Sequence, residues 1–324
     1  MNLHEHKKDF NELVSVVALK MNLPESAIAR DYFIVLLLDN LANSEYAAKC
    51  VFKGGTSLSK CYPESIERFS EDIDLTFLGM DKSDNYCDKI IKKIEQVMTR
   101  EFKTKKIPNE RYKRSKSMYV WFANEQNKIK LEIGSNVKPD PYSVKTLKSY
   151  IHEYLEETMP QYIEKYNLNS VSLNVLNIER TFVDKLMAVK RHAVCGTLFK
   201  KVRHIYDVTK LYELEEIQNF LKDKEELKRI IGLTKETDSY YLTKRNISKD
   251  YNPLEKFDFD SFKIYFNDEI KSIYENMHND LLYTNERQSF EKALKTFEQI
   301  NNLLKEIDEW YINVENQLLH TTDF

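Results

Sequence analysis

Two short stretches decide the fold prediction: Phe52-Lys53-Gly54-Gly55-Thr56-Ser57 and, further along the chain, Asp72-Ile73-Asp74-Leu75-Thr76-Phe77. The first stretch belongs to an apolar run, 50–55, that ends in two glycines, which predicts a buried strand entering a turn. Residues 56–62 can form a short helix after it. In 72–77 acidic and apolar side chains alternate, which predicts a strand with both aspartates on one face.

The glycine turn and the aspartate pair together predict a phosphate-handling site. Glycines let the backbone approach phosphates, and N–H groups at the start of a helix bind phosphate oxygens. Two carboxylates on one face can hold a divalent metal, Mg²⁺ or Mn²⁺. The acid-x-acid pair alone indicates little, because about eight such triplets are expected by chance in this composition. No Gly-Lys-Ser/Thr closes the glycine turn, which excludes a Walker P-loop.

A third carboxylate often completes a two-metal site, and Glu132 is the one that the pattern offers. It lies in the alternating segment 128–134, which predicts another strand. The alternative is a solvent-facing Glu132 paired with a neighbouring lysine.

The remaining pattern predicts an α+β protein with a mixed sheet, followed by a mainly helical C-terminal bundle. The expected domains are 1–178 and 179–324, the second contributing Lys185 and Asp207 to the site. Two further strands are predicted at 117–123 and 170–177, with a hairpin turn from Asn124 to Asn127. Helices are predicted at 24–43, 82–101, 179–194, 199–222, 259–279 and 286–319.

The last predicted helix has apolar residues at alternating steps of three and four. This heptad pattern is compatible with a dimerising or partner-binding coiled coil, but a long helix packed within a bundle is favoured. The seam consists of Phe290, Ala293, Phe297, Ile300, Leu304, Ile307, Tyr311, Val314 and Leu318.

Composition and cysteine usage indicate a globular cytoplasmic protein. The chain is 42% hydrophobic and 31% charged, with only 6 Gly and 7 Pro. No apolar run reaches the roughly 20 residues of a membrane span, and the N-terminus has no signal-like apolar segment. Four cysteines without CxxC spacing are interpreted as free thiols in a reducing compartment.

Charge is unevenly distributed along the chain, and this distribution indicates where an anionic partner would bind. Residues 251–324 have 15 acidic and 7 basic residues, a balance of −8, so the rest of the chain carries +5. Residues 103–116 contain seven Lys or Arg and one Glu, and a second basic cluster occurs at 190–203. Such clusters suit an RNA backbone, although 103–116 is equally compatible with a solvated basic loop. The candidate RNA-binding residues are Lys103, Lys105, Lys106, Arg111, Lys113, Arg114, Lys200, Lys201 and Arg203.

The runs 52–60 and 68–75 resemble the AbiEii/AbiGii toxin family, bacterial nucleotidyltransferases of the DNA polymerase β-like superfamily found in abortive-infection and toxin–antitoxin loci. Residues 179–186 look like the family's helix with a catalytic lysine, and 204–208 look like its later motif with an aspartate. The matches occur in family order over about 53–212. The segment between Arg191 and the later motif lacks a clean match.

The resemblance implies a role for each matching residue. Asp72 and Asp74 would bind metal, Lys185 would contact phosphates and Asp207 would complete the site. The nucleotide-binding residues would be Lys53, Gly54, Gly55, Thr56, Ser57 and Ser70. From the residues alone, Lys185 could instead extend its ammonium group to solvent. Asp207 could similarly form an ordinary helix-surface ion pair with Arg203 or Lys210.

The function implied is a metal-dependent nucleotidyltransferase toxin that transfers NMP from an NTP to RNA, with the tRNA 3′ end as leading acceptor and a cognate antitoxin as partner. One alternative keeps the same site but has a small-molecule or protein acceptor. The other is a non-catalytic domain that binds nucleotide or RNA, or an antitoxin.

Overall fold

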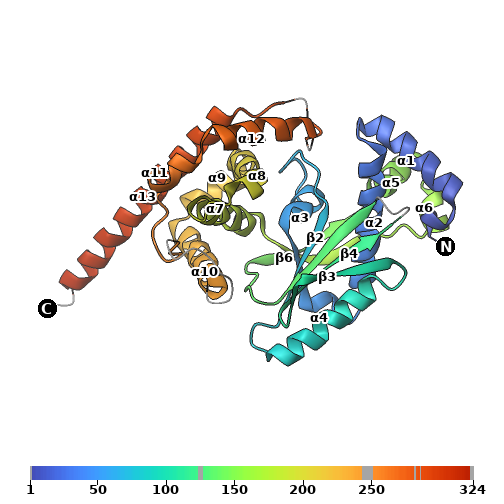
Figure 1. Cartoon of the computed structure of the whole chain (residues 1–324), viewed down its shortest axis with the longest axis horizontal. Coiled ribbons are helices and arrows are strands. Elements are labelled where there is room, and N and C mark those ends of the chain that lie inside the picture. Colours follow the sequence, from blue (N-terminus) through green and yellow to red (C-terminus); the bar gives the residue numbers. More distant parts are fainter. Residues whose placement is uncertain (1, 123–126, 243–250, 281, 285, 322–324) are drawn as a thin grey trace. The chain divides into compact units, whose positions relative to one another are not determined.

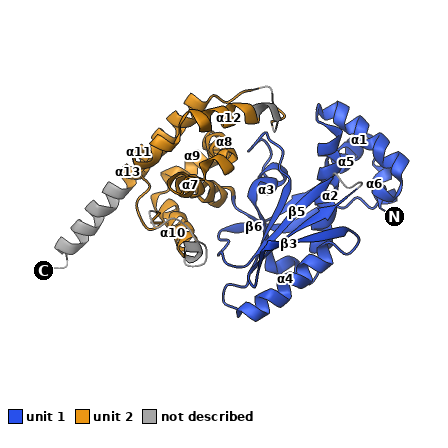
Figure 2. Cartoon of the chain, in the orientation of Figure 1, with its two compact units in different colours: residues 1–177 blue, residues 178–324 orange. Residues whose placement is uncertain are grey.

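The computed structural model describes residues 2–122, 127–242, 251–280, 282–284 and 286–321. Within these, it describes only the backbone at the helix ends 240–242, 278–280 and 308–321. The chain forms two compact units, Met1–Asn177 and Ile178–Phe324 (Figure 2). The hairpin turn expected at Asn124–Asn127 falls, up to residue 126, outside the described residues.

Unit 1 is built on a mixed sheet (Figure 1). The sheet has seven strands in the order β3-β4-β5-β2-β1-β7-β6. The pairs β1–β7 and β2–β5 are parallel, and the others are antiparallel. The predicted α+β class with a mixed sheet is therefore confirmed. The strands are β1 (Cys50–Lys53), β2 (Asp72–Phe77), β3 (Lys103–Tyr112), β4 (Ser115–Trp121), β5 (Lys128–Gly134), β6 (Tyr142–Leu147) and β7 (Val171–Leu176).

The alternating sequence of β2 explains its central place in the sheet. Ile73 and Leu75 are almost fully buried, whereas Asp72 and Asp74 on the other face are only partly buried. β5 has the same alternation, and it contacts α2 and α4. Burial of one apolar face fixes the register, because a shift of one residue would turn every apolar side chain outward.

The helices of unit 1 begin and end close to the predicted positions where the sequence has clear signals. α2 (Glu25–Ala42) follows Pro24, and α4 (Asp84–Met98) begins after Ser83, whose hydroxyl accepts a hydrogen bond from the Tyr86 N–H. α3 (Gly54–Cys61) starts at the first glycine of the turn. The remaining helices are α1 (Lys7–Met21), α5 (Tyr150–Thr158) and α6 (Gln161–Lys165).

Unit 2 is helical in its described residues. Its α-helices are α7 (Ile178–Val194), α8 (Val202–Tyr212), α9 (Glu215–Lys222), α10 (Lys224–Leu242), α11 (Phe259–Phe262), α12 (Asp268–Asp280) and α13 (Phe290–Thr321). From Phe290 to Ile307 every member of the apolar seam of α13 is buried, and α13 packs on α8, α11 and α12. This packing supports the bundle interpretation for that half of the helix. The side chains of Tyr311, Val314 and Leu318 lie outside the described residues.

Two predicted helices are wrong in extent, and neither two of the strands nor the helices α1, α5, α6 and α10 were predicted. The stretch 199–222 forms α8 and α9 instead of one helix, and 259–279 is interrupted after Phe262. β3 and β6 are the edge strands of the sheet, and most of their side chains are exposed. Without a buried apolar face, an edge strand has little of the alternation by which strands are recognised.

The described helices include none that is both long enough and apolar enough to cross a membrane.

Candidate functional site

The glycine turn packs directly on the second aspartate. Gly54 has φ +88°, and a Cβ atom at this position would overlap Asp74 Oδ2. A Cβ atom on Gly55 would lie 2.9 Å from both Arg68 Nη2 and Ser70 Oγ. In the register of β1 and β2, Lys53 is opposite Asp74. The two glycines therefore allow the start of α3 to approach the carboxylate more closely than any other residue type would.

Hydroxyl groups tie the start of α3 to the strand that carries the aspartates. Thr56 Oγ1 donates a hydrogen bond to the Asp72 carbonyl oxygen and lies 2.8 Å from Ser70 Oγ. Ser57 Oγ donates to the Gly54 carbonyl oxygen at 2.9 Å. Thr56 and Ser57 are buried, so their side chains hold the turn in shape. Their backbone N–H groups belong to the first turn of a helix, where such groups point along the axis and favour anions.

Asp72 and Asp74 are two residues apart in β2, so their side chains lie on the same face of the strand. In the parallel register of β2 and β5, Lys130 lies beside Asp72 and Glu132 lies beside Asp74. The donor set suits Mg²⁺, which proteins commonly bind through one or two carboxylates while substrate phosphates and water complete the octahedron. The described residues contain no cluster of three or more His, Cys, Asp or Glu that could hold a metal by itself.

Glu132 is engaged by a lysine in the structure. Lys130 Nζ forms ion pairs with Glu132 and, at 2.8 Å, with Glu110. Burial alone would lower the pKa of Lys130, but its hydrogen bonds to the two carboxylates outweigh burial and raise it. Lys130 therefore stays charged and neutralises much of the negative charge that Glu132 brings to this face. The ion pair supports the alternative for Glu132, and its role as a metal ligand stays a prediction.

Arg68 is a further candidate site residue, which the sequence did not single out. Its side chain is buried, lies against Gly55, and donates from Nη1 to the Phe69 carbonyl oxygen at 3.0 Å. A buried guanidinium group beside a glycine turn adds positive charge where phosphates would bind. The only signal in the sequence was its place just before the aspartate strand.

In unit 2, Lys185 of α7 and Asp207 of α8 form a buried ion pair. The Lys185 Nζ–Asp207 Oδ2 distance is 2.7 Å, and the Lys185 and Asp207 side chains are 6% and 0% exposed. His204 Nδ1 lies 3.5 Å from Lys185 Nζ and 4.0 Å from Asp207 Oδ2. The Lys185 ammonium group is thus held on a carboxylate and does not extend to solvent. Their catalytic roles stay predictions.

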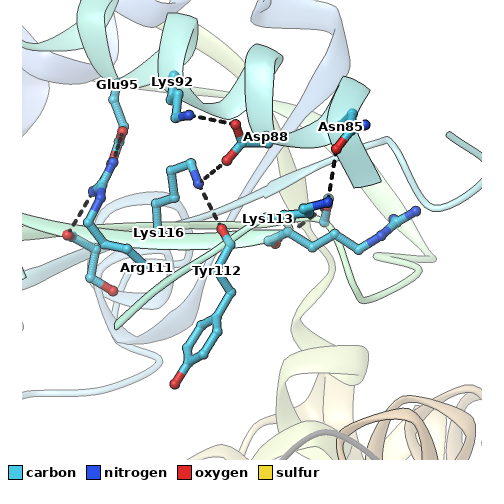
Figure 3. A network of polar contacts seen from close by, with 11 residues as sticks. Asn85, Asp88, Lys92, Glu95, Arg111, Tyr112, Lys113 and Lys116 are labelled. Atoms are coloured by element: carbon cyan, nitrogen blue, oxygen red, sulfur yellow. Dashed lines mark hydrogen bonds and ion pairs between the residues drawn. The ribbon is translucent and has the colours of Figure 1, made fainter. Parts of the chain in front are cut away.

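Part of the first basic segment is occupied by contacts to α4 (Figure 3). Arg111 binds both carboxylate oxygens of Glu95 at 2.7 Å, and Lys113 donates to Asn85 Oδ1 at 3.0 Å. Arg114 pairs with Asp84 at 2.5 Å. By contrast, the side chains of Lys103, Lys105 and Lys106 in β3 are exposed. The segment consists of strand β3, a turn and the start of β4, with ion pairs near the turn, so the interpretation as a solvated loop is wrong.

The second basic cluster likewise contains both residues engaged in contacts within the protein and residues exposed to solvent. Lys190 is buried and donates to the Lys256 carbonyl oxygen at 2.8 Å, and burial lowers its pKa. Arg191 pairs with the buried Asp238. Lys200 and Lys201 are exposed, and Arg203 is partly buried. Lys200 and Lys201 are therefore the exposed lysines of this cluster.

The four cysteines are free thiols, and Cys50, Cys61 and Cys87 are buried. Burial raises the pKa of Cys50 and of Cys61 to about 12. A thiol with so high a pKa is a poor nucleophile at neutral pH. These two cysteines therefore have a packing role.

Comparison with one solved structure supports the fold. The chain is similar to MenT4, the nucleotidyltransferase toxin Rv2826c from Mycobacterium tuberculosis H37Rv, with a TM-score of 0.53 and 16% sequence identity over 92% of both chains. It also matches a putative nucleotidyltransferase from H. pylori, with a TM-score of 0.38 and 17% identity over 79% of this chain and 98% of that one. The search of curated proteins found no match.

The family model described as "Nucleotidyl transferase AbiEii toxin, Type IV TA system" matches residues 36–296. This range contains the glycine turn, the aspartate strand, and both α7 and α8. The match covers far more than half of the chain and agrees with the α+β polymerase β-like fold. The chain therefore belongs to the AbiEii family of nucleotidyltransferase toxins of type IV toxin–antitoxin systems.

Proposed function

We propose that this toxin transfers a nucleoside monophosphate from an NTP to an RNA acceptor, with the 3′ end of tRNA as the leading acceptor. The observation that carries the proposal is the packing of Gly54 on Asp74, which joins a helix start to a carboxylate pair. Phosphate oxygens at the helix start would lie next to metal-binding carboxylates, as nucleotidyl transfer requires.

Each candidate site residue of unit 1 has a distinct role in this proposal. Asp72 and Asp74 hold Mg²⁺ or Mn²⁺, and the backbone N–H groups from Gly54 to Ser57 bind the triphosphate. Lys53 and Arg68 add positive charge beside the turn, and Ser70 supports Thr56. When bound, the metal would neutralise phosphate charge and favour the deprotonated form of an attacking hydroxyl. The acceptor oxygen then forms a bond to the α-phosphorus, and pyrophosphate leaves.

Lys185 has the proposed role of a phosphate contact, with Asp207 as its positioning residue. Their 2.7 Å ion pair holds the ammonium group on the carboxylate and fixes its direction. A charged, oriented amine stabilises negative charge that develops on phosphate oxygens.

The proposal is tested by incubating the full chain with each α-labelled NTP, magnesium and total RNA. Label should enter RNA with the wild type, and Asp72→Asn should reduce the rate by roughly 10²–10⁴-fold, corresponding to several kcal/mol of lost stabilisation. Asp81→Asn is the matched control, because Asp81 is exposed and paired with Lys82 at 2.6 Å. Equal labelling by the wild type and Asp72→Asn would falsify the proposal.

The acceptor is identified in the same experiment. Periodate oxidation of the RNA destroys its terminal diol, so label transfer to a 3′ end should disappear. Label that appears instead in a low-mass product or in protein would assign the small-molecule or protein acceptor. NTP binding without any labelled product would favour a non-catalytic domain.

Glu132 is tested separately. If Glu132 is a third metal ligand, Glu132→Gln should raise the magnesium concentration needed for the half-maximal rate by roughly 10-fold or more. A Glu132 that only pairs with Lys130 predicts an unchanged magnesium requirement.

A further inference from the structure

Next to the aspartate strand, three neighbouring strands present aromatic rings and lysines on one face. Tyr119 and Trp121 are two positions apart in β4, and both are partly exposed. Between and beside them, Met118 and Val120 are buried on the other face. We call the set Lys103, Lys105, Tyr119, Trp121 and Lys128 the aromatic–lysine face.

The strand register places this face in line with the aspartates. Lys130 of β5 lies beside Asp72 of β2, and Tyr119 of β4 lies opposite Lys130. Lys105 of β3 lies opposite Tyr119. Partners in register share a face, so these four side chains form one row across the sheet. A second row, formed by Lys128, Trp121 and Lys103, runs beside it.

The rings and the lysines are already in contact. The Tyr119 and Trp121 ring centroids are 6.0 Å apart in an edge-on arrangement, and Lys128 Nζ lies 4.2 Å from the Tyr119 centroid. Lys103, Lys105 and Lys128 are exposed. Lys130, in the same row, is held by Glu110 and Glu132, so it contributes little positive charge to a ligand. The face thus combines flat apolar rings with three exposed cations.

We propose that the aromatic–lysine face binds an unpaired segment of the acceptor RNA, with bases stacked on Tyr119 and Trp121 and phosphates on Lys103, Lys105 and Lys128. This inference rests on the proposed function and names the surface that leads the acceptor to the aspartates. Interleaved aromatic and basic side chains on a sheet are the combination that single-stranded nucleic acid requires.

The geometry suits a strand that ends at the aspartates. Neighbouring strands lie roughly 4.8 Å apart, so Tyr119, two strands from Asp72, is roughly 10 Å away across the sheet. A stacked nucleotide rises about 3.4 Å, so the ring would meet a base about three positions from the reacting end. A duplex would not stack its bases on the rings, because these bases are already stacked on each other.

The test measures binding of a fluorescently labelled oligoribonucleotide to the full chain without NTP or magnesium. Tyr119→Leu and Trp121→Leu keep apolar bulk but remove the ring, whereas Tyr119→Phe and Trp121→Phe keep an aromatic ring. Tyr142→Leu is the matched control, because Tyr142 is an exposed tyrosine of β6 at the opposite edge of the sheet. Melting temperatures of all variants report any effect on folding.

Each Leu variant should weaken single-stranded RNA binding by roughly 5- to 100-fold, the range that loss of one stacked base predicts. The Phe variants and Tyr142→Leu should bind within about threefold of the wild type, because they keep the stacking rings. Lys105→Gln or Lys128→Gln should reduce the slope of log K against log salt by about 0.7 each, whereas ring removal should leave the slope unchanged. Duplex RNA should lose little affinity in the Leu variants.

Tryptophan fluorescence adds a direct readout. The chain has two tryptophans, Trp121 and Trp310, so Trp310→Phe leaves Trp121 as the sole reporter. A base stacked on Trp121 should quench its emission when the oligoribonucleotide is added.

Leu variants that bind single-stranded RNA as the wild type does, with only a lower melting temperature, would overturn the inference and assign the rings to sheet stability. Unchanged RNA binding with weaker binding of the cognate antitoxin would assign the face to a protein partner, which also overturns it. Ring-dependent RNA binding without label transfer would leave this inference standing while the proposed function fails. Leu variants that bind RNA and transfer label as the wild type does would leave the proposed function standing while this inference fails.

Discussion

At the scale of single residues, Gly54 connects backbone conformation with the chemistry of the site. Its φ of +88° belongs to the left-handed region, and Asp74 occupies the space where a Cβ atom would lie. The residues of the glycine turn and the aspartate pair could be identified from sequence because glycines, hydroxyls and acids occur there in a distinctive order. Arg68 could not, because a charged residue in a Lys- and Glu-rich chain carries little signal until its neighbours are known. For Glu132 the sequence left two alternatives open, a metal ligand or a partner of a neighbouring lysine, and the structure shows the ion pair with Lys130.

Gly54→Ala should reduce nucleotide transfer by roughly 10-fold or more, because the methyl group displaces the Asp74 carboxylate as well as straining the backbone by about 1 kcal/mol. Gly196→Ala is the matched control. Gly196 has φ +65°, but a Cβ atom there would meet nothing within 4 Å. Both variants should lose similar stability in urea unfolding, and only Gly54→Ala should lose activity. Comparable activity in the two variants would mean that the contact with Asp74 is unimportant.

At the scale of elements, strands with one buried apolar face were predictable and the exposed edge strands were not. The helices α1, α5 and α10 were not predicted although each buries apolar side chains. β2 and β5 alternate because their apolar face is buried, and their extents agree with the sequence pattern. β3 and β6 are exposed edge strands, so their composition resembles that of loops. Lysines on β3 also discourage pairing with another chain, which is a structural reason for their presence beside the proposed RNA contact.

Variants of the Lys185–Asp207 ion pair between α7 and α8 can distinguish an effect on stability from an effect on catalysis. Asp207→Asn should destabilise the fold by about 3–5 kcal/mol, because it leaves the Lys185 ammonium group buried without its charged partner. The double variant Lys185→Met/Asp207→Leu should recover most of that stability. Activity should remain lost in the double variant. Recovery of both stability and activity would reduce the pair to a structural role.

The contact of β3 with α4 predicts opposite effects for two basic residues of one segment. Arg111→Ala should cost about 3–5 kcal/mol in urea unfolding, because Glu95, whose side chain is 4% exposed, would lose its bidentate partner. Lys105→Ala should change stability by less than about 0.5 kcal/mol while weakening RNA binding, because Lys105 is exposed. Equal stability of the two variants would contradict the account of this segment.

At the scale of the whole chain, charge is divided between functional and packing regions. The acidic stretch 251–324 belongs to unit 2 and contains α13, whose described seam is buried against other helices of that unit. The similarity to MenT4 extends over 92% of the chain, so both units belong to the shared fold. The helical content of the second half was predictable from periodicity. Its helix breaks depended on packing that no local signal shows.

Global stability should fall as the solution is acidified from pH 6.5 towards pH 4. Burial, followed by the nearby Arg191, lowers the pKa of His192 from its usual 6.5 to about 4. The unfolded chain therefore binds a proton in this range that the folded chain does not, so acidification favours unfolding. After allowance for partial exposure, wild type should lose roughly 1–2 kcal/mol more than His192→Gln between pH 7 and pH 4.5. Parallel urea midpoints of the two proteins across this range would contradict the assignment.

The central claim is that the aspartate pair beside the glycine turn supports transfer of a nucleotidyl group to RNA. The most direct measurement compares NTP labelled in the α-phosphate with the same NTP labelled in the γ-phosphate. The account predicts α-label in RNA, γ-label only in released pyrophosphate, and loss of both signals in Asp72→Asn. Appearance of γ-label in RNA, or full transfer of α-label by Asp72→Asn, would contradict it.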